Sequence, residues 1–178
     1  ELTELIRNPI HEVRLCALII LVNKYKKEDS DKIYQYYLKH LNSVNNWDLV
    51  DTSAPHIVGD YLYNNPEKSK ILLEFSHSEN LWVRRISIVS TFAFIKNNEF
   101  NKTLRIAKLL LNDDQDLIHK AVGWMLREIY KRDKRIIKRF LRQNYALIPR
   151  TTLRYAIERM DKEERLLYLK GNFDVPQR

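Results

Sequence analysis

Apolar residues recur three and four positions apart along most of the chain, which is the spacing that gathers them on one side of an α-helix. The segments PIHEVRLCALIILVNKYKK and NLWVRRISIVSTFAFIKN show this pattern over helical lengths. Shorter amphipathic stretches lie between the long ones, at residues 31–41, 66–75, 100–111 and 135–144. The pattern therefore predicts an all-α protein in which longer and shorter helices alternate.

The helical pattern repeats at a fixed period. Trp47 and Trp82 are 35 residues apart, and the same step reaches Leu117 and Thr152 forwards and Glu12 backwards. Neighbouring positions keep this register, as in the series Val13, Val83, Ile118 and Leu153, and the series Cys16, Ile86, Ala121 and Ala156. Two helices per period, stacked side by side, predict a HEAT-like α-solenoid of about five helical hairpins, forming one domain over residues 1–178.

Composition agrees with this fold and narrows the partners. Three glycines and five prolines leave few turn signals for a β fold, and 44% hydrophobic residues suffice for a sizeable core. A net charge of +8 favours nucleic acid before a membrane surface as the partner. No segment approaches the roughly 18 apolar residues of a membrane span. Cys16, the single cysteine, agrees with a reducing cytoplasm, and we expect it in the core.

The positive charge is concentrated towards the C-terminus. Residues 120–159 contain twelve Lys or Arg against three acidic residues. Such a segment could hold phosphate groups, but a solvated helical face has the same composition.

Beside the apolar stripe, the long helices carry a second stripe, at positions 12, 15 and 19 and their equivalents in the later repeats. Every tryptophan of the chain lies on it. Its candidate DNA-binding and aromatic residues are Trp47, Trp82, Trp124, Arg85, Lys120, Tyr155 and Arg159. Because the inner helices of a solenoid line its concave surface, we expect this stripe to form a groove. Position 14 points the opposite way, so Arg84 is expected outside the groove and its neighbour Arg85 within it.

Asp51 breaks the repeat. It occupies the position that holds Cys16, Ile86, Ala121 and Ala156 in the other repeats. A buried carboxylate without a partner costs several kcal/mol, so its presence needs a reason. One reason is structural, an ion pair with Arg85 of the next repeat; the other is chemical, a carboxylate facing the groove beside Trp47. Asp48 lies nearer the expected helix start, where carboxylates commonly favour the terminus.

The stretches NNWDLVD, GDYL, LWVRR and HKAVGWMLRE resemble, in order and spacing, the AlkD-type DNA alkylation repair glycosylases, and the resemblance covers nearly the whole chain. It implies HEAT-like-repeat enzymes that remove alkylated purines from duplex DNA. Trp47, Asp51 and Trp124 match the catalytic cluster of the family, and Arg85 its DNA-contacting arginine. The family also has additional N-terminal helices, so the chain is expected to begin at about the second repeat of that plan.

The resemblance implies hydrolysis of the N-glycosidic bond of positively charged N3- or N7-alkylated purines, without a base-flipping pocket. The carboxylate would stabilise the oxocarbenium-like sugar and the indoles would hold the cationic nucleotide. We expect a cytoplasmic monomer that acts on double-stranded DNA and needs no cofactor.

Other chemistries have little support in the sequence. Five histidines show no HExxH or paired Cys/His spacing, so no metal site is predicted. Two binding functions remain as alternatives: a non-catalytic HEAT-like scaffold for structured DNA or protein, in which Asp51 holds the repeats in register, and a peptide-binding repeat protein.

Overall fold

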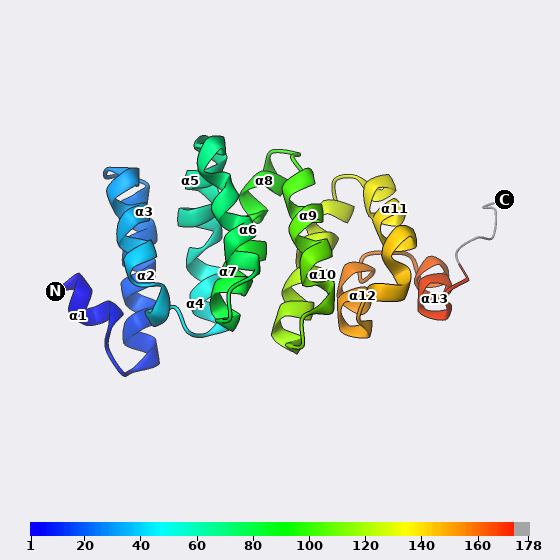
Figure 1. Cartoon of the computed structure of the whole chain (residues 1–178), viewed down its shortest axis with the longest axis horizontal. Coiled ribbons are helices and arrows are strands. Elements are labelled where there is room, and N and C mark those ends of the chain that lie inside the picture. Colours follow the sequence, from blue (N-terminus) through cyan, green and yellow to red (C-terminus); the bar gives the residue numbers. More distant parts are fainter. Residues whose placement is uncertain (173–178) are drawn as a thin grey trace.

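The computed structural model describes residues 1–172, and it contains helices and no strand in that range (Figure 1). The helices follow one another along a single axis, with α1 at one end of the stack and α13 at the other. The predicted all-α solenoid is therefore confirmed. No helix within these residues combines the length and the apolar run needed to cross a membrane.

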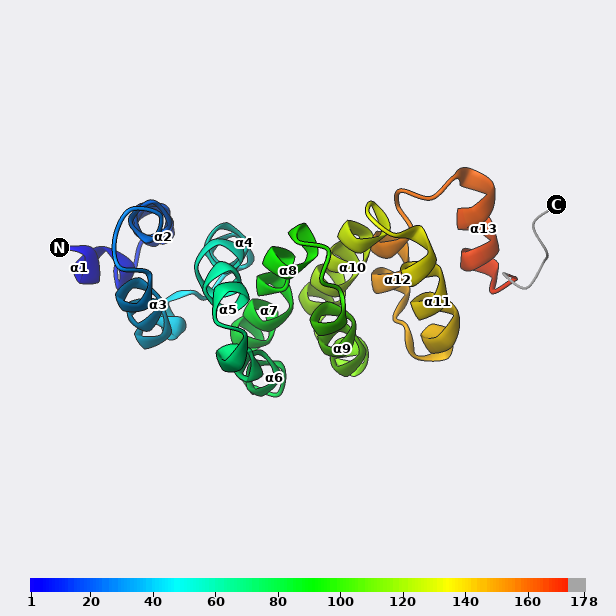
Figure 2. The same cartoon turned by 90° about the horizontal axis from the view of Figure 1, so that it is seen from above.

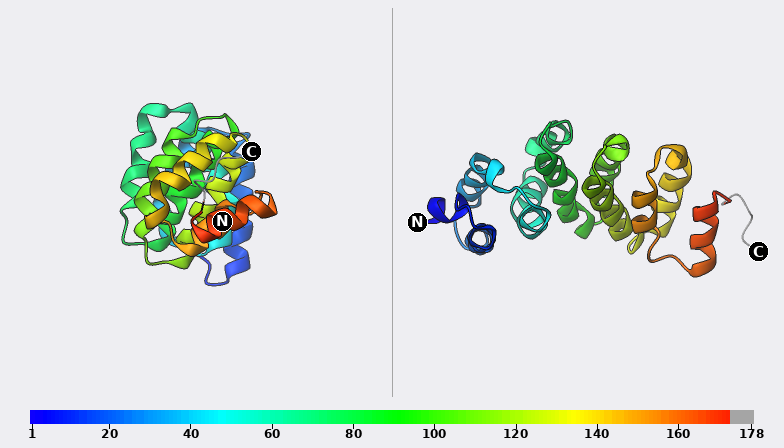
Figure 3. Two further views of the ribbon diagram at one scale, coloured as in Figure 1. Left: turned by 90° about the vertical axis from the view of Figure 1, so that its right-hand side faces the viewer. Right: turned by 90° about the horizontal axis from the view of Figure 1, so that it is seen from below.

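The helices form two layers (Figure 2). The inner layer contains α2 (His11–Tyr25), α4 (Trp47–Ser53), α7 (Leu81–Ser90), α10 (Asp116–Tyr130) and α12 (Arg150–Ala156). The outer layer contains α3 (Ser30–Lys39), α6 (Ile71–Ser76), α9 (Asn101–Leu109) and α11 (Lys134–Asn144). The view from below in Figure 3 shows the same two layers. Each inner helix contacts the next one in the series.

Shorter elements complete the chain. These are α1 (Leu2–Ile6), α5 (Asp60–Asn64), α8 (Phe92–Lys96) and α13 (Lys162–Lys170), the 3₁₀ turns Leu41–Ser43, Pro66–Lys70, Leu110–Asn112 and Tyr145–Leu147, and the π-turn Pro55–Gly59.

A proline divides the inner helix of the second repeat. Pro55 has no backbone N–H, so the α-helical ladder of α4 cannot continue through it. The chain forms a π-turn instead, in which the N–H of Gly59 donates to the carbonyl of Ala54 at 2.8 Å, and helical geometry resumes in α5. Trp47 and Asp51 lie on α4, so they precede this irregular turn.

The core runs between the two layers, as the apolar stripe predicts, except at the first repeat. Ile86, Ala121 and Ala156 are fully buried, whereas Cys16 of α2 is exposed and Ile20 is 36% exposed. The expectation that Cys16 lies in the core is therefore wrong. Periodicity alone thus does not decide which residues of the first repeat are buried.

Gly123 allows α10 and α12 to pack closely. A Cβ atom at this position would lie 2.4 Å from the Cβ of Tyr155 and 2.7 Å from the carbonyl oxygen of Thr152. The second contact is with backbone, which cannot rotate away. The glycine therefore sets the distance between the two helices that carry Trp124 and Tyr155.

We expect Gly123→Ala to lower the free energy of unfolding by about 1–3 kcal/mol, because the added methyl group forces the helices apart. Thermal unfolding checks this, with Lys108→Ala on the exposed side of α9 as the control. A variant that melts with the parent protein would show that α12 can shift without cost.

Candidate active site

Side chains from four inner helices line one surface hollow of about 350 Å³. The lining residues are Trp47 and Asp51 of α4, Arg85 of α7, Leu117, Lys120, Trp124 and Arg127 of α10, and Tyr155 of α12. Six of the eight site residues predicted from the sequence thus share one hollow. Trp82 and Arg159 do not line it.

Asp51 and Arg85 form a fork-shaped ion pair in this hollow. The Nε and Nη2 atoms of Arg85 donate to Oδ1 and Oδ2 of Asp51 at 2.9 and 2.8 Å. The remaining Nη1 atom donates to the carbonyl oxygen of Leu117 in the first turn of α10. One guanidinium therefore joins α4, α7 and α10, which are inner helices of three successive repeats.

The pair is closed on the arginine side and open on the aspartate side. The side chain of Arg85 is 5% exposed, whereas that of Asp51 is 18% exposed. The guanidinium of Arg85 is buried, and its N–H groups already donate to Asp51 and Leu117. Contact between Arg85 and DNA therefore stays a prediction. The inter-repeat ion pair expected as a structural reason for Asp51 is present. The carboxylate nevertheless keeps a surface towards the hollow.

Burial raises the pKa of the Asp51 carboxyl above its ordinary value, and the hydrogen bonds and charge of Arg85 offset part of that rise. Both carboxyl oxygens accept a hydrogen bond from the guanidinium, which is the geometry of an ionised carboxylate. A carboxylate oxygen can accept about two hydrogen bonds. Each Asp51 oxygen therefore retains acceptor capacity for a water molecule or for a positively charged group.

The two indoles of the hollow differ in exposure and in ring contacts. Trp47 is 52% exposed, at the first position of α4, where Asn46 caps the helix by accepting a hydrogen bond from the Trp47 N–H at 2.7 Å. Trp124 is half-buried, and its ring packs at a tilt against Phe92, with ring centroids 6.1 Å apart. The hollow therefore has one anchored aromatic wall and one that is open to solvent, and both are suited to a cation.

Basic side chains line the same hollow as the carboxylate. Lys120 pairs with Asp116 on the same helix at 2.8 Å, and this hydrogen bond raises the pKa of the ammonium group. Arg127 lines the hollow and pairs with Glu158. Arg127 is not among the predicted residues, although it follows Trp124 by one helical turn and continues the stripe through Leu117 and Lys120. Following that stripe one turn further along α10 would have found it.

The two predicted residues outside the hollow have other surroundings. Trp82 is half-buried at the start of α7 and packs against the core. Arg159 is 62% exposed and lies 4.0 Å from Glu158. Neither residue lines the hollow, so binding of DNA by Trp82 or Arg159 stays a prediction.

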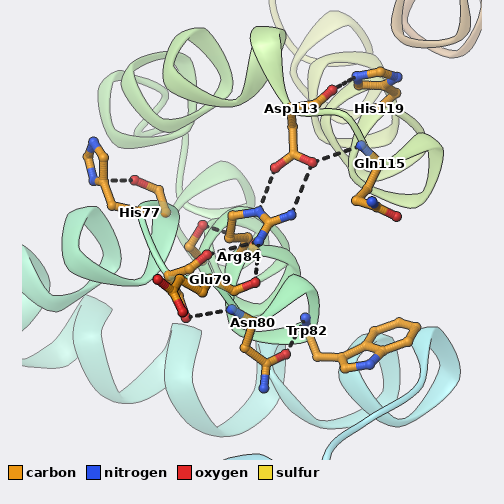
Figure 4. Close-up of polar contacts among 11 residues, drawn as sticks. His77, Glu79, Asn80, Trp82, Arg84, Asp113, Gln115 and His119 are labelled. Carbon is orange, nitrogen blue, oxygen red and sulfur yellow. Dashed lines mark hydrogen bonds and ion pairs between the residues drawn. The ribbon is translucent and has the colours of Figure 1, made fainter.

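Arg84, the neighbour of Arg85, reaches in the other direction, as position 14 of the repeat predicts. Its guanidinium donates to both oxygens of Asp113, at 2.5 and 3.2 Å, and to the carbonyls of Ser78 and Glu79 at 2.9 Å (Figure 4). Asp113 precedes α10, so adjacent arginines of α7 attach to two different points at the start of α10. These contacts fix the placement of Trp124 relative to Asp51.

Asp48 has a structural environment. One of its oxygens accepts a hydrogen bond from the backbone N–H of Leu49 at 2.9 Å, and the other lies 2.7 Å from Nε2 of His11. It lies in the first turn of α4 and is not part of the hollow. Asp48 is therefore a natural control for substitutions of Asp51.

Within residues 1–172, no group of three or more His, Cys, Asp and Glu side chains is placed to hold a metal ion. The hollow therefore offers a carboxylate, aromatic faces, and ammonium and guanidinium groups. Fold and hollow together define a helical-repeat protein with a surface hollow suited to a cationic group carried on a polyanion.

The sequence comparisons place this protein among known families. The sequence model of the family described as DNA alkylation repair enzyme matches residues 1–160. The chain belongs to this DNA alkylation repair family, which confirms the resemblance carried by its tryptophan and aspartate motifs. A comparison with curated proteins gave no match.

Proposed function

We propose that the protein is a DNA glycosylase that hydrolyses the N-glycosidic bond of cationic N3- or N7-alkylated purines in duplex DNA. The observation that carries the proposal is the placement of a partly exposed carboxylate, Asp51, in one hollow with the indoles of Trp47 and Trp124. Membership of a DNA alkylation repair family supports the substrate class. No metal or cofactor is needed for the chemistry below.

The departing base needs little catalytic assistance from the protein. Alkylation at N3 or N7 gives the purine a positive charge, so the base leaves as a neutral molecule and needs no general acid. Positive charge then develops on the sugar as the bond breaks. A fixed carboxylate close to that charge stabilises the transition state more than the ground state, and partial burial strengthens the effect.

Asp51 is suited to this role because its position is fixed before the substrate arrives. The fork with Arg85 prevents rotation of the carboxylate, and the contact of Arg85 with Leu117 ties the pair to α10. The acceptor capacity that remains on the carboxylate oxygens can hold the attacking water. In this account Arg85 is a positioning residue.

The shape of the hollow supports recognition without base flipping. A pocket for an extruded base needs walls on both faces of the ring. Here one wall, Trp47, is 52% exposed, so the hollow is not closed around a ring. The protein can therefore contact a damaged nucleotide from the side of the DNA backbone while its base stays in the duplex. Lys120, Arg127 and Tyr155 line the same hollow as the carboxylate and can donate hydrogen bonds to phosphate oxygens.

The proposal is tested by incubating methylated duplex DNA with excess protein and measuring free 7-methylguanine and 3-methyladenine together with abasic sites. We expect both bases to appear, and their summed amount to equal that of the abasic sites. DNA binding without base release would favour the other candidate, a non-catalytic scaffold for structured DNA or protein. The Asp51–Arg85 pair is the observation that favours that alternative, because it also joins three repeats.

The pKa of Asp51 gives a prediction for pH. Only the ionised carboxylate can stabilise the sugar cation, so kcat/KM for base release should fall as pH falls through the pKa of Asp51. Because burial raises this pKa, the acid limb should lie above the range of an ordinary aspartate. The measurement is single-turnover base release against pH, corrected for spontaneous depurination. A profile that stays flat down to the ordinary aspartate range would contradict the role of Asp51.

A further inference from the structure

We infer that the outer face of α11 binds the phosphate backbone of duplex DNA, as a second contact surface separate from the hollow. The surface, called the α11 strip below, consists of Lys134, Arg135, Lys138, Arg139 and Arg142. It lies on the outer layer, whereas the residues of the hollow belong to the inner layer (Figure 2). The inference does not depend on base release.

The composition of α11 is unfavourable for the helix itself. Its 11 residues contain five cations and no acid. Three pairs of these cations are four residues apart, where like charges repel each other across one helical turn. Lys134 and Arg135 also lie at the N-terminal end, where the helix dipole disfavours positive charge. The stability of the fold does not explain why five cations occur on this helix. Binding of a polyanionic partner would explain them.

Neighbouring acids lie close to two of the five cations of the strip. Glu164 of α13 lies 2.6 Å from the ammonium group of Lys138. Asp133, the N-cap, accepts hydrogen bonds from the backbone of α11, and its carboxylate is 3.9 Å from Arg135 Nε. The side chain of Arg135 is 92% exposed, and Arg139 is also exposed. Most of the positive charge therefore faces solvent.

The form of the strip indicates a repeated phosphate ligand. The cations follow one side of the helix, and Arg135 and Arg142 are about 10 Å apart along its axis at 1.5 Å per residue. They border a shallow hollow of about 450 Å³. A row of this length matches several phosphates of a nucleic acid backbone better than one small anion.

A membrane surface fits less well. The large apolar residues Ile137, Phe140 and Leu141 are buried against the rest of the protein. A helix that lies in a bilayer interface needs such residues on its free side. Duplex DNA is the polyanion that family membership indicates.

The test measures binding of an undamaged, fluorescently labelled duplex over a range of salt concentrations. In the variant Lys134→Gln/Arg135→Gln/Arg139→Gln, each lost phosphate contact should reduce the slope of log Kobs against log [salt] by about 0.9, or about 2–3 for the three. Glutamine is a good helix former, so α11 should stay folded, and circular dichroism checks this. The single variant Arg139→Gln should reduce the slope by about 0.9.

The matched control is Lys27→Gln/Lys32→Gln/Lys39→Gln, which removes the same charge at and near α3 of the outer layer. We expect the control to keep the slope of the parent protein. An unchanged slope in the α11 variant, or an equal reduction in the control, would overturn the inference. The inference would also be overturned if the α11 variant kept the DNA slope of the parent protein but lost binding to phosphatidylserine vesicles. That result would assign the strip to a membrane.

Discussion

Asp51→Asn should reduce the single-turnover rate of 7-methylguanine release by about 100- to 1,000-fold, the usual effect of removing one preorganised electrostatic group. Asparagine has nearly the shape of aspartate, and its amide oxygen can still accept one hydrogen bond from Arg85. The guanidinium loses its counter-ion, so the variant should melt below the parent protein. What disappears is the negative charge that faces the developing sugar cation. Binding of undamaged duplex should change little, because phosphate contacts supply most of that affinity.

Asp48→Asn is the matched control for this experiment. It makes the same chemical change on the same helix, three residues earlier, at a carboxylate that does not line the hollow. We expect Asp48→Asn to retain most of the release rate. Equal rates in the Asp51→Asn variant and the parent protein would end the enzymatic assignment of Asp51.

Arg85→Met should produce the largest loss of stability, because it leaves the partly buried carboxylate of Asp51 without its counter-ion. Breaking a buried pair in this way costs about 3–5 kcal/mol. For a chain of this size the melting temperature should fall by roughly 6–20 °C. The measurement is thermal unfolding followed by circular dichroism at neutral pH.

The double variant Arg85→Met/Asp51→Leu separates structure from chemistry. Replacing both partners with apolar residues of similar size is often neutral or stabilising, so much of the lost stability should return. Base release should not return, since the carboxylate is gone. If the double variant regained both stability and base release, the pair would be a register device and the catalytic group would lie elsewhere.

The overall fold could be predicted because a solenoid follows from local information. The 35-residue period places Trp47, Arg85 and Trp124 on one stripe of successive helices. Asp51 follows Trp47 by one turn on the adjacent stripe, and stacking brings the four together. For this reason the convergence of the candidate residues on one hollow was accessible without coordinates.

What the sequence could not decide depends on distances between side chains. Arg85 could face either DNA or Asp51, and only the fold shows that its guanidinium is buried in the fork. Trp82 has the period of Trp47, but it packs against the core at the start of α7. Cys16 has the pattern of a core residue, yet it is exposed on α2.

The most direct test compares two duplexes that differ in one base, 7-methylguanine in one and hypoxanthine in the other, under single-turnover conditions with the parent protein. The central claim is that a fixed carboxylate beside two indoles accelerates departure of a purine that carries positive charge. We therefore expect release of 7-methylguanine and no measurable release of hypoxanthine, which lacks that charge. Release of both bases at similar rates, or of neither base from DNA that is bound, would contradict the account.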